Sequence, residues 1–425
     1  MGLRTLDDLS PGGRLLVRLD LNSPVDDGVV RDNPRFARHA ETLRELLAAD
    51  HAVAVLAHQG RPGRDTFVGL EPHAELLADH LESPVEYVPD TDGDEALDAI
   101  RALSSGEVLV LGNVRMTDDE LPERPAAEHA ESDLVRTLAP EFDAYVNDAY
   151  SAAHRSHASL VGFPLVMPAY AGRVMEREYE ANTAIGSREF DGDVVMVLGG
   201  NKTRDVVRVM QALADRVDAF LLGGAIGEHF LRAEGYEVGY DVEGTDLYDD
   251  QWAAVGGTVA GLLDEHRETI HLPADLAYAD DDGERAEIEV DEIDAKTRDF
   301  LDVGTETVMA YAPVIADASA VFVKGALGVF EDDRFAVGTV GVLEAIAESD
   351  AFSVVGGGDT SRAIDAYGLD GADFSHVSIA GGAYLRALTG EPLPAVEALR
   401  ASAERFGVGV EAGSPGASSA DTDAA

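Results

Sequence analysis

The sequence predicts an α/β protein with two doubly wound, Rossmann-like parallel-sheet lobes that are joined by a hinge helix. Short apolar runs rich in Val and Leu alternate with longer amphipathic segments along the 425 residues, which is the pattern of successive βα units. This rhythm restarts after Asp191-Gly192, and the chain is longer than most single domains. The 43 glycines fit the many tight turns that such a fold needs.

The apolar runs of the first half predict five strands with helices between them. The strands are expected at Leu15–Leu19, Ala52–Ala57, Val85–Val88, Val108–Leu111 and Ala144–Val146. The helices are expected at Pro34–Ala49, Glu71–Leu81, Asp94–Leu103 and Ala126–Leu138. Proline favours a helix start at Pro34, because the first helical turn leaves its backbone N–H unpaired in any case.

The second half predicts six further strands. They are expected near Val194–Leu198, Ala219–Leu222, His271–Leu272, Val321–Val323, Ser353–Val355 and Val377–Ile379. The segment Tyr170–Ser187 is expected to be the helix that joins the lobes. We therefore assign residues 1–169 to the first lobe and 170–390 to the hinge helix and second lobe. The small, polar residues 411–425 are expected to form a disordered tail.

Composition excludes several classes of function. The chain has no Cys, which rules out disulfides, thiolate metal sites and a cysteine nucleophile. Its 81 acidic and 32 basic residues give a formal net charge of -49, so nucleic acid is not an expected partner. The weakly charged stretch Ala158–Gly172 contains two prolines and is too short to span a bilayer. Since Met1–Gly13 lacks the apolar run of a signal peptide, we expect no membrane partner and a cytoplasmic location.

Basic side chains follow the predicted strands of the first lobe. They occur in Asp20-Leu21-Asn22, His58-Gln59-Gly60-Arg61, Asn113-Val114-Arg115 and Asn147-Asp148 with His154-Arg155, and Arg35 opens the first helix. Ligands of open parallel sheets bind beyond the carboxyl ends of the strands, and the planar fork of arginine suits phosphate and carboxylate. The residues therefore predict a site for a small polyanion. The alternative is that each arginine pairs with a nearby acidic residue.

Glycines follow the predicted strands of the second lobe. They occur in Gly199-Gly200-Asn201-Lys202, Gly223-Gly224, Lys324-Gly325 and Gly356-Gly357-Gly358-Asp359-Thr360. Glycines let backbone N–H groups approach phosphate, and a helix N-terminus adds favourable partial charge. Asp359 is a candidate ligand of a nucleotide-bound Mg²⁺, and Thr360 is a candidate helix cap or phosphate contact. Tight packing alone is the alternative explanation for each glycine cluster.

Common nucleotide-binding motifs are absent from the sequence. Lys202 follows Asn201 rather than the glycine of a P-loop, and no G-x-G-x-x-G fingerprint opens a βα unit. A P-loop NTPase or a dehydrogenase is therefore disfavoured. Lysine is rare, with only Lys202, Lys296 and Lys324 in the chain, and two of these three lie beside glycines at the ends of apolar runs.

Taken together, the motifs resemble those of the phosphoglycerate kinase family, of the archaeal, salt-adapted type. The resemblance rests on Arg18-Leu19-Asp20-Leu21-Asn22, His58-Gln59-Gly60-Arg61-Pro62, Gly112-Asn113-Val114-Arg115, Val146–Tyr150 with Ala153-His154-Arg155, Gly325–Glu331 and Gly356–Thr360. Their order and spacing match from roughly Leu15 to Pro394.

The resemblance implies reversible phosphoryl transfer from 1,3-bisphosphoglycerate to ADP, giving 3-phosphoglycerate and ATP. It implies phosphoglycerate ligands at Asp20, Asn22, Arg35, His58, Arg61, Arg115 and Arg155. It implies that Lys202, Glu331, Gly356, Gly357, Gly358, Asp359 and Thr360 face Mg-ADP or Mg-ATP. Lys202 would contact the transferred phosphoryl group, and Arg35 would reach it from the other lobe. The resemblance also implies that residues 391–410 complete the first lobe.

Lobe closure is expected to accompany the reaction, because the two sets of ligands belong to different lobes. We expect the hinge around Gly162–Gly172 and near the C-terminal return. Closure would also exclude water from the reacting groups.

Two positions depart from the family pattern. Val206 replaces a second lysine that many members have four residues after Lys202, and Val323-Lys324-Gly325-Ala326 replaces Trp-Asn-Gly-Pro. We hypothesise that Lys324 takes over the neutralising role of the missing lysine. The alternative is that Lys324 points to solvent.

Two other classes of function stay open at this point. One is a nucleotide-binding or regulatory protein that kept the fold without turnover, and the other is a scaffold that binds partners through its acidic surface. Lys202, Arg35 and Asp359 are all present, which favours an active enzyme. Both a monomer and a homodimer are compatible with the sequence.

The acidic surface predicts a dependence on salt. At molar salt the Debye length is only about 3 Å, so repulsion among the 81 acidic residues is strongly screened. We expect structure or activity to be lost in dilute buffer, and a salt titration followed by circular dichroism and activity measures this. Full stability in dilute buffer would contradict the prediction.

Overall fold

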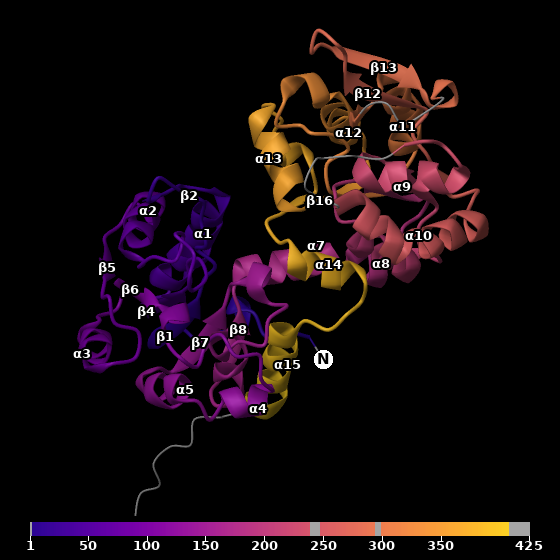
Figure 1. Cartoon of the computed structure of the whole chain (residues 1–425). Helices are drawn as coiled ribbons and strands as arrows, with labels where there is room; N and C mark the ends of the chain where they lie inside the picture. Colours follow the sequence, from indigo (N-terminus) through magenta and orange to yellow (C-terminus); the bar gives the residue numbers. More distant parts are fainter. Residues whose placement is uncertain (1, 239–246, 294–298, 408–425) are drawn as a thin grey trace, which may run out of the picture. The chain divides into compact units, whose positions relative to one another are not determined.

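The computed structural model describes residues 2–238, 247–293 and 299–407, which divide into two compact units (Figure 1). The first unit contains residues 2–148, 155–173 and 394–407, and the second contains 149–154 and 174–393, apart from the gaps just given. The tail expected at 411–425 and the end of the segment 391–410 lie outside the described residues.

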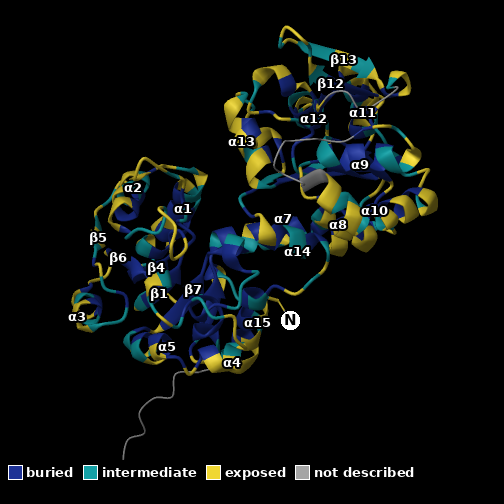
Figure 2. Ribbon diagram, viewed as in Figure 1, coloured by how far each residue is buried: buried dark blue, intermediate teal, exposed yellow. Residues whose placement is uncertain are grey.

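The first unit is built on a six-stranded parallel sheet. Its strand order is β5-β6-β4-β1-β7-β8, with β1 at Arg14–Arg18, β4 at Ala52–Ala57, β5 at Val85–Tyr87, β6 at Val108–Asn113, β7 at Ala144–Asn147 and β8 at Ala169–Ala171. In the register, Leu16 pairs with Ala54 of β4 and with Tyr145 of β7. Every residue of β4 is buried, as expected for a strand covered on both faces. Figure 2 shows the buried strands and the exposed outer faces of the helices.

Helices cover this sheet, and a short hairpin extends the loop after β1. The helices are α1 at Pro34–Ala48, α2 at Glu71–Leu81, α3 at Asp94–Ala102, α4 at Ala126–His129, α5 at Asp133–Leu138, α6 at Ala158–Val161 and α15 at Pro394–Phe406. The hairpin pairs β2, Val25–Asp26, with β3, Val29–Val30. The Ser402 hydroxyl joins α15 to the sheet, because it accepts the N–H of Ala169 at 2.9 Å and donates to the carbonyl of Met167 at 3.1 Å.

Two of the predicted helices were wrong in their extent. The helix expected at Ala126–Leu138 is divided into α4 and α5, because the Ser132 side chain accepts the N–H of Val135 and caps a new helix start. The helix expected at Tyr170–Ser187 begins only at Arg173. Tyr170 instead belongs to β8, where it pairs with Val146 in the sheet.

The second unit is built on another six-stranded parallel sheet. Its strand order is β11-β10-β9-β15-β16-β17, with β9 at Val194–Leu198, β10 at Ala219–Leu222, β11 at Ile270–His271, β15 at Ala320–Lys324, β16 at Phe352–Gly356 and β17 at His376–Ser378. The helices are α7 at Arg173–Ser187, α8 at Thr203–Leu213, α9 at Gly224–Glu234, α10 at Leu247–Glu265, α11 at Thr305–Ala316, α12 at Val337–Ala347, α13 at Gly358–Ala366 and α14 at Gly382–Leu388.

The second unit also carries a small antiparallel sheet that the sequence did not predict. Its order is β13-β12-β14, with β12 at Asp275–Ala279, β13 at Arg285–Glu289 and β14 at Phe300–Val303. Three of the five residues of β13 are charged, so it lacks the apolar run that marks the other strands. The predicted fold class, two lobes on parallel sheets, is confirmed. In the part of the chain that the structure describes, no helix combines the length and the apolar character of a membrane span.

Candidate active site

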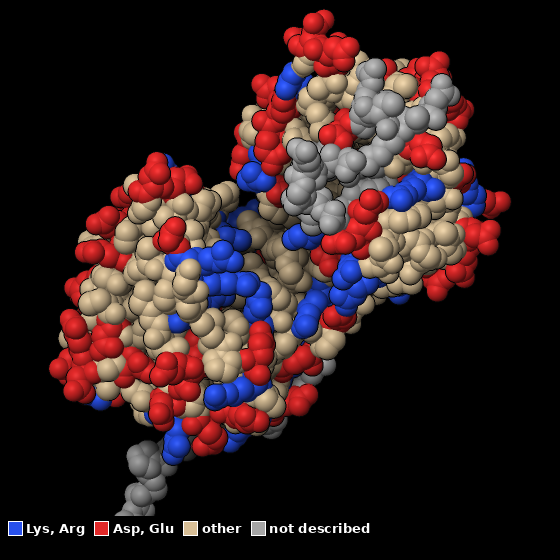
Figure 3. Space-filling view, viewed as in Figure 1, with Lys and Arg blue, Asp and Glu red and all other residues tan. Residues whose placement is uncertain are grey.

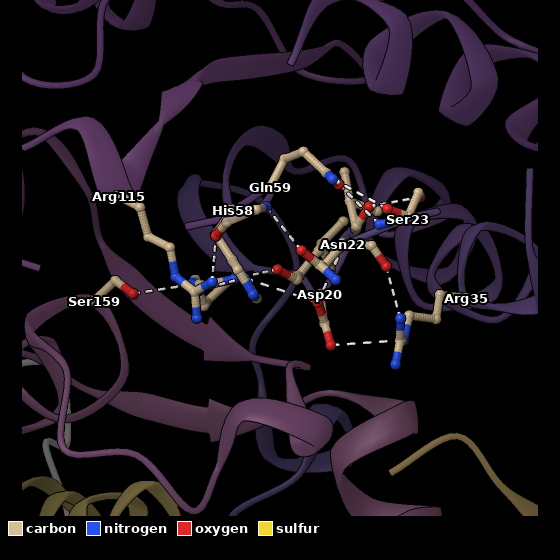
Figure 4. Close-up of polar contacts among 12 residues, drawn as sticks. Asp20, Asn22, Ser23, Arg35, His58, Gln59, Arg115 and Ser159 are labelled. Carbon is tan, nitrogen blue, oxygen red and sulfur yellow. Dashed lines mark hydrogen bonds and ion pairs between the residues drawn. The ribbon is translucent and has the colours of Figure 1, made fainter. Parts of the chain in front are cut away.

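Polar side chains converge at the carboxyl edge of the first sheet, beyond the neighbouring strands β6, β4 and β1 (Figure 4). Asp20 and Asn22 follow β1, His58 follows β4, and Arg115 follows β6. Neighbouring strands lie about 4.8 Å apart, so these side chains are close although their positions in the sequence are not. We call this group, together with Arg35, the anion cup.

Direct contacts join the members of the anion cup. The Arg35 guanidinium lies 3.6 Å from the Asp20 carboxylate and donates to the carbonyl of Asn22 at 2.6 Å. The Asn22 side chain accepts the N–H of Gly60 at 2.9 Å, and Arg115 donates to the carbonyl of Gly60 at 2.6 Å. The loops after β1, β4 and β6 are thereby tied to one another.

Local structure positions Arg35 at the start of α1. The Asn33 side chain caps this helix by accepting the N–H of Arg35 at 3.0 Å. Two other predicted phosphoglycerate ligands, Arg61 and Arg155, are less closely connected to the anion cup. Arg61 is exposed, although its charge acts on Arg115, and Arg155 lies 3.8 Å from the Glu123 carboxylate, as the ion-pair alternative expected.

A buried arginine that the sequence analysis did not assign lies beneath the anion cup. Arg18 is 1% exposed; its Nε donates to the Ser159 hydroxyl at 2.8 Å, and its Nη2 lies 3.0 Å from His58 Nδ1. The fully buried Glu120 lies 3.8 Å from the same guanidinium. Burial alone would raise the pKa of Glu120, but hydrogen bonding to His157 and the charge of Arg18 outweigh it and lower the pKa. The signal in the sequence was a basic residue at the end of the apolar run of β1.

The contact with Arg18 decides the state of His58. A guanidinium can only donate, so His58 Nδ1 accepts and the ring proton lies on Nε2. Burial, reinforced by the charges of Arg18, Arg115 and Arg35, holds the pKa of His58 well below its ordinary value, in spite of nearby Asp20. Burial and then Arg18 lower the pKa of Arg115 to about 10. Positive charge in the anion cup is thus poorly solvated, and a bound anion would stabilise it.

Hydrogen bonds to the carboxyl end of β7 hold the backbone of the anion cup. The His39 ring contacts the buried Asp148 at 2.8 Å through Nδ1 and accepts the N–H of Asp20 at 3.2 Å through Nε2. This arrangement fixes the His39 proton on Nδ1. Figure 3 shows a group of Lys and Arg side chains on the visible face of the first unit, whereas Asp and Glu cover much of the surface around it.

In the second unit, glycine loops pack against one another at the carboxyl edge of the sheet. The N–H of Gly199 donates to the carbonyl of Lys324 at 2.9 Å, and the N–H of Gly200 donates to that of Ala326 at 2.6 Å. A Cβ on Gly325 would lie 2.4 Å from the Gly199 carbonyl oxygen, and Gly325 has a φ of 86°. Glycine is therefore required where these two loops cross.

A cavity of about 440 Å³ opens beside these loops, within the range of small-molecule sites. Glycines, apolar side chains and carboxylates form its wall, including Gly200, Gly224, Leu276, Phe300, Val329, Glu331 and Asp359. Glu331 and Asp359 are 53% and 63% exposed and share Arg362, at 3.0 and 2.7 Å. Arg362 is a further charged group that the sequence analysis did not select.

The structure separates the remaining predicted nucleotide residues by exposure. Lys202 is exposed at the start of α8. Gly356 is buried with Tyr384 against it, and Gly357 and Gly358 lead into α13. Thr360 is buried, and its hydroxyl donates to the carbonyl of Gly356 at 3.3 Å. The N-cap of α13 is Gly357 and no side chain caps this helix start, so the prediction that Thr360 is a helix cap was wrong.

Lys324 ends the strand between the two main glycine loops. It pairs in register with Leu198 of β9 and Gly356 of β16. Burial, followed by the charge of Lys202, lowers the pKa of Lys324, while Asp205 and Asp359 oppose this shift. The side chain is half-buried and close to these charges, which disfavours the alternative that it points freely to solvent.

We expect the His58 imidazole to stay neutral between pH 8 and pH 6. Because its folded pKa lies well below the ordinary value of 6.5, this group adds stability above pH 6.5 and loses it as the pH falls toward the folded pKa. A pH titration by nuclear magnetic resonance, assigned with His58→Gln, measures this. A midpoint at the ordinary value would contradict the prediction.

Replacing Gly325 should loosen the second unit. Gly325→Ala forces a side chain into a left-handed conformation and against the Gly199 carbonyl, with an expected cost of about 2 kcal/mol. Gly358→Ala is the matched control, since a Cβ there meets nothing within 4 Å, and it should change stability by less than about 0.5 kcal/mol. Thermal unfolding at molar salt compares them, and equal midpoints for the two variants would refute the argument.

Comparison with known proteins identifies the family of the chain. The family model described as phosphoglycerate kinase matches residues 6–391. The chain is 68% identical to a phosphoglycerate kinase of Halorubrum lacusprofundi, over 94% of this chain and 98% of the relative. It is 63% identical to that of Haloarcula marismortui, over 94% and 100%. These haloarchaeal relatives fit the predicted salt adaptation.

A solved structure is also similar. The crystal structure of phosphoglycerate kinase from Pyrococcus horikoshii has a TM-score of 0.88 and 34% identity, and the match covers 95% of this chain and all of that one. Both its extent and its identity go beyond a likeness of fold. The chain therefore belongs to the phosphoglycerate kinase family, and it is an enzyme that transfers a phosphoryl group reversibly between 1,3-bisphosphoglycerate and ADP.

Proposed function

We propose that the anion cup binds the phosphoglycerate and that the cavity of the second unit binds the nucleotide. The observation that carries this proposal is the convergence of three cationic or imidazole groups, Arg35, His58 and Arg115, from separate loops in a strongly acidic chain. The proposed phosphoglycerate ligands are Asp20, Asn22, Arg35, His58, Arg61, Arg115 and Arg155. The proposed nucleotide residues are Lys202, Lys324, Glu331, Gly356, Gly357, Gly358, Asp359 and Thr360.

The side chains near the nucleotide cavity fit a magnesium ion carried by the nucleotide. Mg²⁺ keeps several waters and takes one or two carboxylates plus substrate phosphates. Among residues 2–238, 247–293 and 299–407, no group of three or more metal-binding side chains forms a closed cage, whereas Asp359 offers an exposed carboxylate at the cavity. Asp359 would hold the ion, which would neutralise phosphate charge during transfer.

The proposed mechanism needs no protein nucleophile. A terminal phosphate oxygen of ADP attacks the phosphorus of the acyl phosphate in line, the bond from that phosphorus to the acyl oxygen breaks, and the carboxylate of 3-phosphoglycerate leaves. Arg35 and Lys202 stabilise the negative charge spread over the transferred group, and loop N–H groups and the N-terminus of α13 add to this. Because the two sites belong to different units, transfer requires their ligands to meet.

The neutral His58 has a defined role in this proposal. Its Nε2–H can donate to an oxygen of the phosphoglycerate while Nδ1 accepts from Arg18. Arg18 and Glu120 would act as positioning residues, because they are buried beneath the anion cup and orient His58 without reaching the ligand.

The two sites can be tested in one experiment with paired variants. Arg115→Met should raise the KM for 1,3-bisphosphoglycerate about tenfold and leave the KM for ADP unchanged, whereas Lys324→Asn should do the reverse, because each removes a charged partner of one ligand. Steady-state kinetics at molar salt measures both constants, so each variant is the control for the other. Unchanged constants for Lys324→Asn would rule out its role, and equal changes in both constants would rule out the division of sites.

A further inference from the structure

Lys202 occupies an unusual place at the start of α8. It is the N-cap residue of this helix, and its side chain makes no capping hydrogen bond. The first N–H groups of a helix have no partner within the helix, and a cap side chain normally accepts one of them. A lysine ammonium only donates, and its charge is disfavoured at the positive end of a helix. Neither capping nor the helix dipole therefore accounts for a lysine at this position.

A side chain of another helix supplies the acceptor that the start of α8 needs. Gln251 lies on α10, and its Oε1 accepts the N–H of Thr203 at 2.7 Å. The Nε2 of the same amide donates to the carbonyl of Asn201 at 2.7 Å. The two bonded groups belong to the residues directly before and after Lys202. One side chain thus holds the backbone on both sides of the lysine.

These two bonds need a donor and an acceptor at the end of one side chain. The amide of Gln251 carries both, whereas a carboxylate offers acceptors only and a thioether is a weak acceptor without a donor. The orientation of the amide is fixed as well, because the N–H of Thr203 requires its oxygen and the carbonyl of Asn201 requires its nitrogen. Replacing Gln251 by Glu or Met therefore removes one or both of the bonds.

Further contacts fix the rest of this helix start. The carbonyl of Lys202 accepts the N–H of Asp205 at 3.0 Å. The hydroxyl of the buried Thr203 is hydrogen-bonded to His229 Nδ1 of α9 at 2.7 Å, and the His229 ring stacks on Trp252 of α10 with the ring centroids 5.9 Å apart. Helices α8, α9 and α10 pack against one another (Figure 1). The backbone at Lys202 is thereby held in place, while its side chain is exposed.

We propose that Gln251 is a positioning residue for phosphoryl transfer. Its amide fixes the backbone around Lys202 and thereby the point from which the ammonium reaches the transferred phosphoryl group. This inference rests on the role that the proposed function gives to Lys202. A charge stabilises a transition state only from the correct position, and a displacement of about 1 Å can cost on the order of a hundredfold in rate. Gln251 acts through Lys202 and does not itself contact the reacting atoms.

Replacing Gln251 should lower kcat more than it changes nucleotide binding. Gln251→Met keeps the length of the side chain and loses both hydrogen bonds, so we expect kcat to fall about tenfold. ADP does not carry the transferred phosphoryl group, so its dissociation constant should change by less than about threefold. Steady-state kinetics and isothermal titration calorimetry at molar salt measure these constants. Weaker binding of ADP with an unchanged kcat would overturn the proposal.

Gln211→Met is the matched control, because Gln211 is exposed on the same helix, α8. It should leave kcat within about twofold of the wild-type value. Thermal unfolding shows that each variant is folded at the assay temperature. Should Gln251→Met not fold, Gln251→Glu still decides: its carboxylate keeps an acceptor for Thr203 but cannot donate to Asn201, so kcat should again fall. A wild-type kcat in Gln251→Glu would refute the positioning role.

A double-variant cycle separates the positioning of Lys202 from a general effect on the fold. Lys202→Ala removes the ammonium, so in this background Gln251→Met should change kcat by less than about twofold. An equal loss of kcat in both backgrounds would overturn the inference and leave the proposed role of Lys202 intact. A wild-type kcat in Lys202→Ala alone would instead overturn the proposed role of Lys202, and the inference with it.

Discussion

The anion cup depends on a buried ion pair and hydrogen-bond network beneath it. Arg18 and Glu120 are almost completely buried, and Ser159 bonds to both of them at 2.8 Å. Buried charges are costly unless such partners satisfy them. The guanidinium of Arg18 fixes the tautomer of His58 and adds positive potential at the carboxyl edge of the sheet. The loops above it can then keep Arg35 and Arg115 close together.

The two proposed sites would bind negative charge by different means. The first unit gathers cationic side chains at one place, although the chain as a whole has a formal charge of -49. The second relies on backbone: glycines bring loops after β9, β15 and β16 within contact of one another. Lys324 adds a single half-buried charge between these loops. Strong, fixed side-chain contacts suit a small substrate, whereas backbone N–H groups and a helix N-terminus suit phosphates.

In the proposed nucleotide site, the apolar cavity would add a third form of recognition. Most of its wall can contact a base only through non-directional packing, which distinguishes bases poorly. Discrimination therefore depends on the few polar atoms in the wall. Asp302 is committed to the fold, whereas Glu331 and Asp359 are more than half exposed at the same cavity.

Much of the fold and of the site could be predicted from the sequence, because local patterns carry them. Short apolar runs that alternate with amphipathic segments mark the parallel strands. The carboxyl ends of parallel strands must meet at one edge of the sheet. Asp20, His58 and Arg115 could thus be grouped from their places after strands. Glycine clusters could be read in the same way, since their conformational freedom is a property of the residue.

Only the tertiary structure decided which partner each side chain takes. Arg18 bonds to Ser159, 141 residues away, and Ser402 bonds to Ala169, 233 residues away. The tertiary structure also placed Tyr170 in a strand rather than a helix. It paired Arg155 with Glu123 and made Glu228 part of a cavity wall. No local pattern encodes these outcomes, because a side chain's hydrogen bonds and desolvation depend on groups that only folding brings near it.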